Sequence, residues 1–304
     1  LAAARRYLAG QESTERGQFD LPGAVLATLG TTGLVFAVIE SAQKGWGSAT
    51  TIEALAVGAA LLVALVVNEA RAAQPIMPLR LFADRERAGA YLARLLFLAG
   101  MIGFFFFTSQ YLQDVLSFSP LQAGLAFLPM TAVNFAVAVV VNRIQGRIGM
   151  RLTLTAGMAF NVAGMAWLSR IGLHSAYLSA VAPPMVLIGI GQGLAFAPMT
   201  SAGIARVDGK DAGAASGLVN TFHQLGSALG LSVVTAIGVA ATPGTAAGKA
   251  AVADRASAAL TGSTGFLAAA LVVVVVLVTS RREAAAIPAA AVPDKAGVDG
   301  PAHA

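Results

Sequence analysis

The chain contains no cysteine, and only 12% of its 304 residues are charged. Without cysteine it can form no disulfide bond, no thiolate nucleophile and no Cys-ligated zinc site. The three histidines, at 174, 223 and 303, lie too far apart in sequence to indicate a metal site. Paired carboxylates, a Ser-His-Asp set and a phosphate-binding loop are also missing from the polar stretches. We therefore expect neither an enzyme nor a protein that needs a cofactor.

The small number of charged residues also indicates whether the chain lies in water or in lipid. A soluble domain has about 25% charged residues, whereas this chain is 57% apolar with a mean hydropathy of +0.74. Its net charge of +5 comes from basic residues scattered between apolar runs, not from a basic polar domain. Nucleic acid is therefore not an expected partner. The composition predicts a protein surrounded by the lipid bilayer.

Long apolar runs give the number of membrane crossings. A helix that crosses the roughly 30 Å hydrocarbon layer needs about 20 mostly apolar residues. The runs are too long for strands of a membrane barrel, which have about ten residues, and they lack strict alternation. We predict an all-α, polytopic membrane helix bundle with about eight transmembrane helices. They are expected at residues 21–40, 51–68, 88–112, 119–142, 151–169, 177–204, 212–240 and 258–280.

The distribution of lysine and arginine predicts the orientation, because these residues accumulate in cytoplasmic loops. With the first residues in the cytoplasm, four basic residues fall in outside loops, namely Lys44, Arg170, Lys249 and Arg255. Fifteen fall inside: Arg5, Arg6, Arg16, Arg71, Arg80, Arg85, Arg87, Arg143, Arg147, Arg151, Arg206, Lys210, Arg281, Arg282 and Lys295. Arg94 alone lies within a span. We therefore predict a multi-pass cell-membrane protein with both ends in the cytoplasm.

Three stretches resemble a known family. They are PIMPLRLFADR at 75–85, YLQDVLSFSPLQAGLAFLP at 111–129 and ASGLVNTFHQLG at 215–226. Together they are similar to the fourteen-helix drug:proton antiporter branch of the major facilitator superfamily. The resemblance implies two extra helices followed by the C-terminal six-helix lobe. It also implies a missing N-terminal lobe, whose first helix carries the acidic residue associated with proton coupling.

The resemblance suggests a division of the chain. It implies a cytoplasmic linker at 1–20, two extra transmembrane helices at 21–70, a cytoplasmic loop at 71–87 and the lobe at 88–280. The tail at 281–304 is rich in Ala, Pro and Gly, so we expect it to be disordered.

Two positions depart from the family pattern. The stretch NRIQGRIGMR at 142–151 is similar to the superfamily's signature loop, but Gly146 stands where that loop carries Asp, and Asn142 where it carries Gly. Its gating carboxylate is therefore absent. Its candidate functional residues are Arg143, Arg147, Gly149 and Arg151. His223 stands where Arg is expected, which would replace a permanent cation by a group that titrates near neutral pH.

Polar residues within spans are the candidates for a substrate or proton path, because polar groups in hydrocarbon are costly. On the seventh span Gly213, Gly217, Asn220, Gln224 and Ser227 share one helical stripe, with His223 beside it. This stripe could form a cavity wall, or it could only join helices by hydrogen bonds.

Other polar positions leave similar choices. Arg94 could extend toward the cytoplasmic headgroups or find a partner in a central cavity. Asp114 could be a solvated or capping residue or part of an outer gate. Asn134, Asn161 and Gln192 could hold helices together or contact substrate.

The predicted function is secondary active transport, with export of hydrophobic or cationic drug-like compounds driven by the proton gradient. The lobes would rock around a cavity at mid-membrane depth. Two alternatives remain: a non-transporting eight-helix scaffold or assembly partner, and an exporter of another small solute on the same fold. The expected partners are a small-molecule substrate, the bilayer and the missing lobe.

Overall fold

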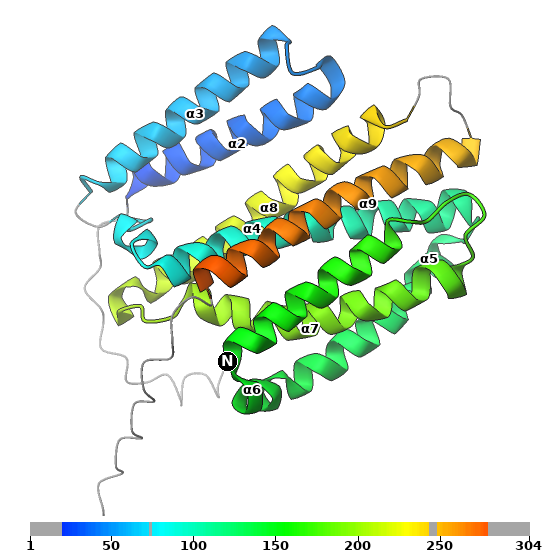
Figure 1. The fold of residues 1–304 in the computed structure, drawn as a ribbon. Coiled ribbons are helices and arrows are strands. Elements are labelled where there is room, and N and C mark those ends of the chain that lie inside the picture. Colours follow the sequence, from blue (N-terminus) through cyan, green and yellow to red (C-terminus); the bar gives the residue numbers. More distant parts are fainter. Residues whose placement is uncertain (1–19, 73–74, 243–247, 279–304) are drawn as a thin grey trace, which may run out of the picture.

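The computed structural model describes residues 20–72, 75–242 and 248–278, and the regular structure within these ranges is helical. A chain in lipid must satisfy its backbone hydrogen bonds internally, which helices do. The helices are α2 (Leu21–Lys44), α3 (Ala49–Glu69), α4 (Arg85–Gln110), α5 (Pro120–Ala126), α6 (Leu128–Leu168), α7 (Ala182–Gly203), α8 (Ala212–Ala240) and α9 (Gly248–Val273) (Figure 1). Short helical turns lie at Leu79–Phe82, Tyr111–Val115, Tyr177–Val181, Gly209–Asp211 and Val274–Val278. The all-α prediction is confirmed.

Seven helical segments of the described chain are long and apolar enough to cross a membrane, and one of them needs dividing. The segment Pro120–Leu168 has 49 residues, which would extend about 74 Å as one straight helix. Gly149 interrupts it with φ 82° and ψ 158°, a conformation open essentially to glycine alone. From this point the two limbs of α6 run in opposite directions, and α7 packs against both (Figure 1). Divided at Gly149, the segments of the described residues number eight, which agrees with the predicted eight crossings; the crossings themselves remain a prediction.

The same kink corrects one prediction. Residues 142–151 were expected to form a loop, but the helix continues through them and only Gly149 departs from helical geometry. A single glycine with positive φ reverses the chain, so no longer connection is needed.

Polar caps lie at the starts of α2, α3, α4 and α5, and two of them show how they act. The Asp84 carboxylate accepts hydrogen bonds from the backbone N–H groups of Glu86 (3.0 Å) and Arg87 (3.2 Å) at the start of α4. Ser119 and Gln122 form a reciprocal capping box at the start of α5. Each cap satisfies N–H groups that have no partner within the helix.

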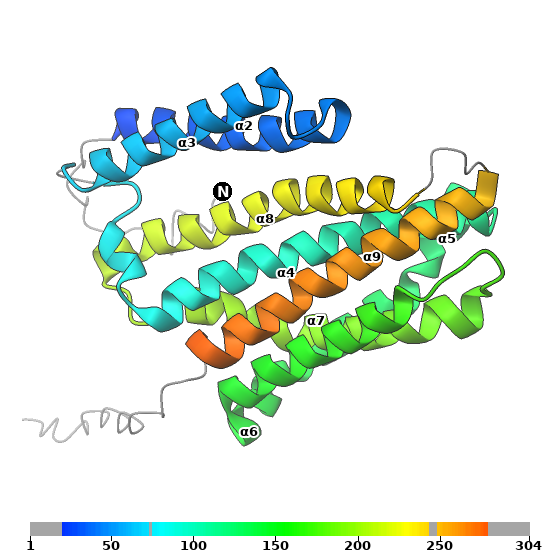
Figure 2. The same ribbon diagram turned by 45° about the horizontal axis from the view of Figure 1, so that its top comes forward.

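The helices form a bundle with a separate hairpin at its side. In the bundle α4 packs on α8 and α9, and α6 packs on α7. The hairpin of α2 and α3 lies apart and contacts the bundle through α8 (Figure 2). This grouping agrees with two linking helices followed by a six-helix lobe, which remains a prediction.

Small residues allow the closest helix contact. Side-chain carbons added at Gly226 and Gly230 of α8 would collide with Leu95 and Ala99 of α4. Membrane helices associate largely through such close packing, since lipid tails are as apolar as the side chains.

The eighth span begins earlier than predicted. Helix α9 starts at Gly248, ten residues before the expected start at 258. Lys249 and Arg255, expected in an outside loop, therefore lie in its first turns. Hydropathy marks the lipid-buried part of a helix, whereas the alanine-rich stretch before it continues the helix through its own propensity. The Lys249 ammonium donates to the Val115 carbonyl (3.0 Å) and the Ser117 hydroxyl (2.6 Å).

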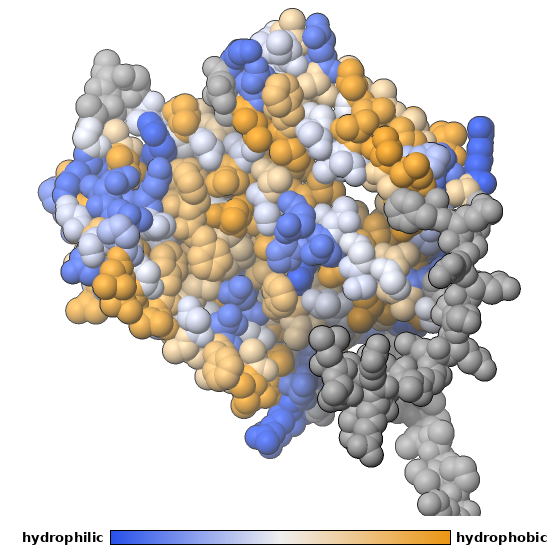
Figure 3. Space-filling model, turned by 180° about the vertical axis from the view of Figure 1, so that it is seen from behind, coloured by the Kyte–Doolittle hydropathy of each residue, from blue (hydrophilic) through white to orange (hydrophobic). Residues whose placement is uncertain are grey.

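Large apolar side chains cover the outside of the bundle. Leu121 and Phe135 are 74% and 70% exposed. Figure 3 shows a face with a mostly hydrophobic middle, a small hydrophilic area near its centre and hydrophilic residues toward the ends. Such a surface suits contact with lipid. The predicted tail, and all of the predicted linker except Asp20, lie outside the described residues.

Candidate functional site

Arg94 lies on α4, nine residues after the helix start at Arg85. Counted from the predicted start of the span at 88, its α-carbon lies six residues, or about 9 Å, inside a crossing of roughly 30 Å. Its side chain is only 6% exposed. A buried cation at this depth must obtain its stabilisation from neighbouring groups.

The contacts of Arg94 bear on whether its side chain extends to the headgroups or finds a partner inside the bundle. The guanidinium donates to the Thr200 hydroxyl (3.2 Å) and at 3.5 Å to the Phe196 carbonyl, both on α7. Its central carbon also lies 3.9 Å from the centre of the Phe196 ring, a cation–π contact. The side chain points into the bundle toward α7 and α8, which favours a partner inside the bundle; the choice between the two alternatives remains a prediction.

His223 of α8 completes these contacts. Its Nδ1 lies 3.2 Å from Arg94 Nη2. A guanidinium can only donate, so Nδ1 must be the acceptor. The imidazole is therefore neutral in this arrangement, with its hydrogen on Nε2. Its ring also meets Phe196 edge-on, with 6.3 Å between ring centres.

Phe196 connects this cation to two amides. A small pocket of about 250 Å³ beside Phe196 is lined by Asn134 of α6 and Gln192 of α7. The Gln192 side-chain oxygen is buried without a hydrogen-bond partner. Four elements thus bring together Arg94, Asn134, Gln192, Phe196 and His223, which we call the polar cluster. Phe196 gave no signal in the sequence.

Asn220 and Gln224 lie on an exposed side of α8. They are accessible because no other described helix covers this side. The predicted stripe on α8 is therefore open around its amides. The glycine end of this stripe has other surroundings. Gly213 and Gly217 line a separate pocket between α8 and the α2–α3 hairpin.

Two predicted candidates lie elsewhere. Asn161 is fully buried between α6 and α7, where its amide donates to the Gly157 carbonyl at 2.8 Å. That contact within the helix agrees with a packing role, whereas the Asn161 side-chain oxygen is buried without a hydrogen-bond partner, so both alternatives for this residue stay open. Asp114 is exposed in the turn after α4, as expected of a solvated residue.

The signature-like stretch surrounds the kink of α6. Arg143 and Arg147 are exposed, and Arg151 is half-buried. Arg147, Gly149 and Arg151 border a polar hollow of about 550 Å³ at this end of the bundle. It is separate from the polar cluster.

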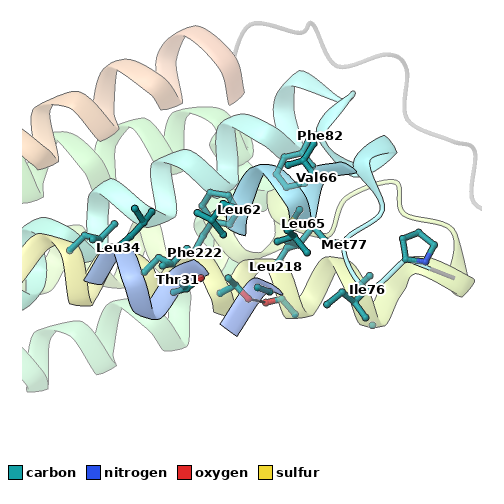
Figure 4. Close-up of a pocket in the computed structure, with 18 residues that line it drawn as sticks. Thr31, Leu34, Leu62, Leu65, Val66, Ile76, Met77, Phe82, Leu218 and Phe222 are labelled. Carbon is teal, nitrogen blue, oxygen red and sulfur yellow. Dashed lines mark hydrogen bonds between the residues drawn. The ribbon is translucent and has the colours of Figure 1, made fainter. Parts of the chain in front are cut away.

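The sequence did not indicate a large apolar pocket between the hairpin and α8. It measures about 680 Å³, within the range typical of ligand sites. Leu34, Leu62 and Leu65 of the hairpin line it together with Leu218 and Phe222 of α8 (Figure 4). Thr31 and Thr221 are its polar side chains. The pocket can hold apolar groups but offers them no charge.

An ion-pair cluster at the start of α4 was also missed. The Arg206 guanidinium pairs with Asp84 (3.2 Å) and Glu86 (2.7 Å). Burial alone would raise the pKa of Asp84, but hydrogen bonds from the Arg87 backbone and Arg206 outweigh it, so that pKa is lowered. The hydrogen bond to Glu86 in turn raises the pKa of Arg206. These contacts fasten the loop after α7 to α4.

Comparison with known proteins identifies the family. Residues 22–231 match the sequence model of the Major Facilitator Superfamily. The chain belongs to this superfamily. The resemblance first carried by the loop motifs is thereby confirmed, and so is the expectation of a transporter family instead of an enzyme.

Superfamily relatives with curated names share much of this chain. The cephamycin export protein CmcT of Amycolatopsis lactamdurans is 41% identical over 251 residues, which cover 81% of this chain and 52% of the relative. The puromycin resistance protein pur8 of Streptomyces alboniger is 34% identical, covering 74% of this chain and 45% of the relative. The lincomycin resistance protein of Streptomyces lincolnensis is 32% identical, covering 75% and 47%.

The chain spans about half the length of these curated relatives. Superfamily membership and the helix count make it a multi-pass membrane protein. The described residues hold no group of three or more His, Cys, Asp or Glu side chains arranged for a metal ion.

Proposed function

We propose that this chain forms the linking helices and C-terminal lobe of a proton-driven exporter of drug-like compounds. The observation that carries the proposal is the polar cluster, where α4, α6, α7 and α8 bring Arg94, Asn134, Gln192 and His223 around Phe196. Polar and charged side chains within membrane spans generally mark a substrate or ion path.

The open side of α8 supports a cavity shared with a second lobe. Asn220 and Gln224 are exposed on a helix whose opposite side packs against α4. One lobe supplies one wall, and alternating access requires two lobes that rock around the same site. The preceding lobe implied by the family resemblance would supply the other wall.

Coupling to protons forms the second part of the proposal. The resemblance assigns an acidic residue to the first helix of the preceding lobe. Among the described residues, His223 is the member of the polar cluster whose side chain ordinarily titrates near neutral pH. Its imidazole accepts from Arg94 only while Nδ1 is unprotonated, so proton binding at Nδ1 would break this contact.

The orientation belongs to the proposal as well. The starts of α2, α4 and α8 and the kink of α6 lie toward one side of the molecule, and predicted cytoplasmic arginines lie at or beside the start of α4, the start of α8 and the kink of α6 (Figure 1). The positive-inside rule assigns that side to the cytoplasm. A cysteine at position 145 should then react only from the cytoplasmic side, and one at position 174 only from outside.

Resistance measurements test the export proposal. The complete reading frame that encodes this chain would be expressed in a bacterium lacking its own multidrug exporters. We expect lower cellular accumulation of several hydrophobic antibiotics, with normal accumulation restored by a protonophore. The relatives' names include cephamycin, puromycin and lincomycin, so these compounds belong in the panel. Unchanged accumulation of every compound would contradict the proposal.

A further inference from the structure

The polar cluster contains a cation but no carboxylate. Arg94 carries the positive charge, and its hydrogen-bond acceptors are the Phe196 carbonyl, the Thr200 hydroxyl and neutral His223. The ion pairs of the described residues do not include Arg94. Its Nε is buried without a hydrogen-bond partner.

The sequence around the cluster explains this imbalance. No aspartate or glutamate occurs between positions 115 and 207, or between 212 and 253. Both limbs of α6 and all of α7 and α8 therefore lack acidic residues. On α4 the only carboxylate is Glu86, in the first turn, where it pairs with Arg206. The lobe cannot neutralise Arg94 from its own cavity-lining helices.

An uncompensated charge is expensive at this depth. Neutral hydrogen-bond acceptors and an aromatic ring recover part of the lost hydration, but an anion would recover more, because charge attraction strengthens as the effective dielectric constant falls. The position thus favours anions that enter the cavity and disfavours cations.

We infer that the cavity selects compounds that carry a carboxylate or sulfonate group on an apolar body. Arg94 would hold the anionic group, and the Phe196 ring and the pocket beside Asn134 and Gln192 would contact the body. The inference rests on the proposed export function and narrows its substrate class. It differs from the sequence prediction, which included cationic compounds.

The route to Arg94 passes Phe196. This ring is 38% exposed and lies against the guanidinium. A rotation of the phenyl side chain would uncover Arg94 toward the small pocket lined by Asn134 and Gln192. Arg94 would then exchange a neutral acceptor for the anion.

Three matched probes test the selectivity: 4-(1-pyrenyl)butyrate, its methyl ester and the corresponding pyrenylbutyl trimethylammonium. Equilibrium binding would be measured on the purified protein, and uptake in inside-out vesicles made from cells expressing the complete reading frame. We expect the carboxylate to bind about tenfold or more tightly than the ester, as a charge-assisted hydrogen bond would produce, and the ammonium to bind most weakly.

Variants assign this preference to Arg94. Arg94→Gln should abolish it, and Arg94→Lys should retain part of it. Arg170→Gln, which removes an exposed arginine far from the cluster, should leave it intact. Thr200→Asp keeps Arg94 but places a carboxylate beside it, so it should also abolish the preference. This variant provides the test even if Arg94→Gln does not fold.

Several results would overturn the inference. One is equal or tighter binding of the ammonium by the wild-type protein. Another is a carboxylate preference that survives in Arg94→Gln or Thr200→Asp. A carboxylate of the preceding lobe that already neutralises Arg94 would produce the first result. Transport of all three probes at similar rates would overturn the inference and leave the export function standing, whereas selective binding without transport would overturn the export function alone.

Discussion

At the scale of single residues, the contact between Arg94 and His223 joins a permanent cation to a titratable ring. The two side chains are 129 positions apart and meet at 3.2 Å. Because the arginine can only donate, the contact holds the imidazole in its neutral form. A proton that binds at Nδ1 must displace Arg94, which makes this contact the natural place to look for pH dependence within the chain.

His223→Gln tests that role. The amide oxygen of glutamine can still accept from Arg94, but it does not titrate. We expect export by the complete transporter to lose part of its pH dependence between about pH 5 and 8. Rates would be measured in vesicles at fixed pH steps. His174→Gln is the control, since His174 is exposed at the other end of the bundle. An unchanged pH profile in His223→Gln would rule out the role.

Single cysteines test the cavity wall, and the chain provides a clean background because it has none of its own. We expect Asn220→Cys and Gln224→Cys in the complete transporter to react with aqueous thiol reagents, because both positions face the proposed cavity. Ala215→Cys should stay unlabelled, since Ala215 is fully buried. The cavity wall would be wrong if positions 220 and 224 never reacted from either side of the membrane.

Much of the polar cluster was predictable from the sequence and some of it was not. Arg94, Asn134, Gln192 and His223 stood out because they are polar within apolar runs. Phe196 did not, since an aromatic residue in a membrane span is ordinary. The partner of Arg94 was also hidden, because helix periodicity orders residues within one helix and says nothing about which helices touch.

At the scale of elements, Gly149 determines how α6 folds. Its φ of 82° with ψ of 158° is strained for any residue with a side chain. Gly146, three positions earlier, is helical and exposed, and a β-carbon added to it would have no neighbouring atom within 4 Å. The two glycines therefore form a matched pair.

We expect Gly149→Ala to lower the free energy of unfolding by about 1–3 kcal/mol, the usual cost of such a backbone conformation. Gly146→Ala should be neutral or slightly stabilising, because alanine is the better helix former. The free energy of unfolding of both variants and of the wild type would be measured in mixed micelles. Equal effects would show that the kink does not depend on the glycine at position 149.

The ion-pair cluster at the start of α4 predicts a dependence on pH. The pKa of Asp84 is lower in the folded protein than its ordinary value of about 3.9. Its stabilisation is therefore fully present at neutral pH and is lost as the pH falls below about 4.

Thermal unfolding of wild type and Asp84→Asn would test this. The variant should be less stable by about 0.5–1 kcal/mol at pH 7, and the difference should shrink toward pH 3. Asp254→Asn, which alters an exposed residue of α9, is the control. A difference that stays constant over this range would contradict the assignment.

Hydropathy predicted the helical crossings well because lipid permits few other backbone arrangements. It failed where the helix leaves the apolar region. The start of α9 at Gly248 and the helical residues around Gly149 both lie in polar stretches. In these stretches the helix boundaries depend on backbone propensity and on the conformation of a single residue. A hydropathy average over a window of residues detects neither.

At the scale of the whole molecule, we propose that the chain forms one wall of a cavity. It covers about half of its curated relatives, and Asn220 and Gln224 remain exposed. We expect residues 1–304 alone to insert into membranes but not to move substrate. Joined to the preceding lobe, they should transport. Vesicle uptake by both forms would be compared, and transport by residues 1–304 alone would disprove the need for a second lobe.

Proton-driven export itself is best measured with the complete transporter in proteoliposomes that carry a pH-sensitive dye. An imposed proton gradient should drive an anionic pyrene substrate against its own concentration gradient, with protons moving in the opposite direction, and a protonophore should stop both. Substrate movement that does not depend on the proton gradient would contradict proton-driven export. So would proton flow that does not change when substrate is added.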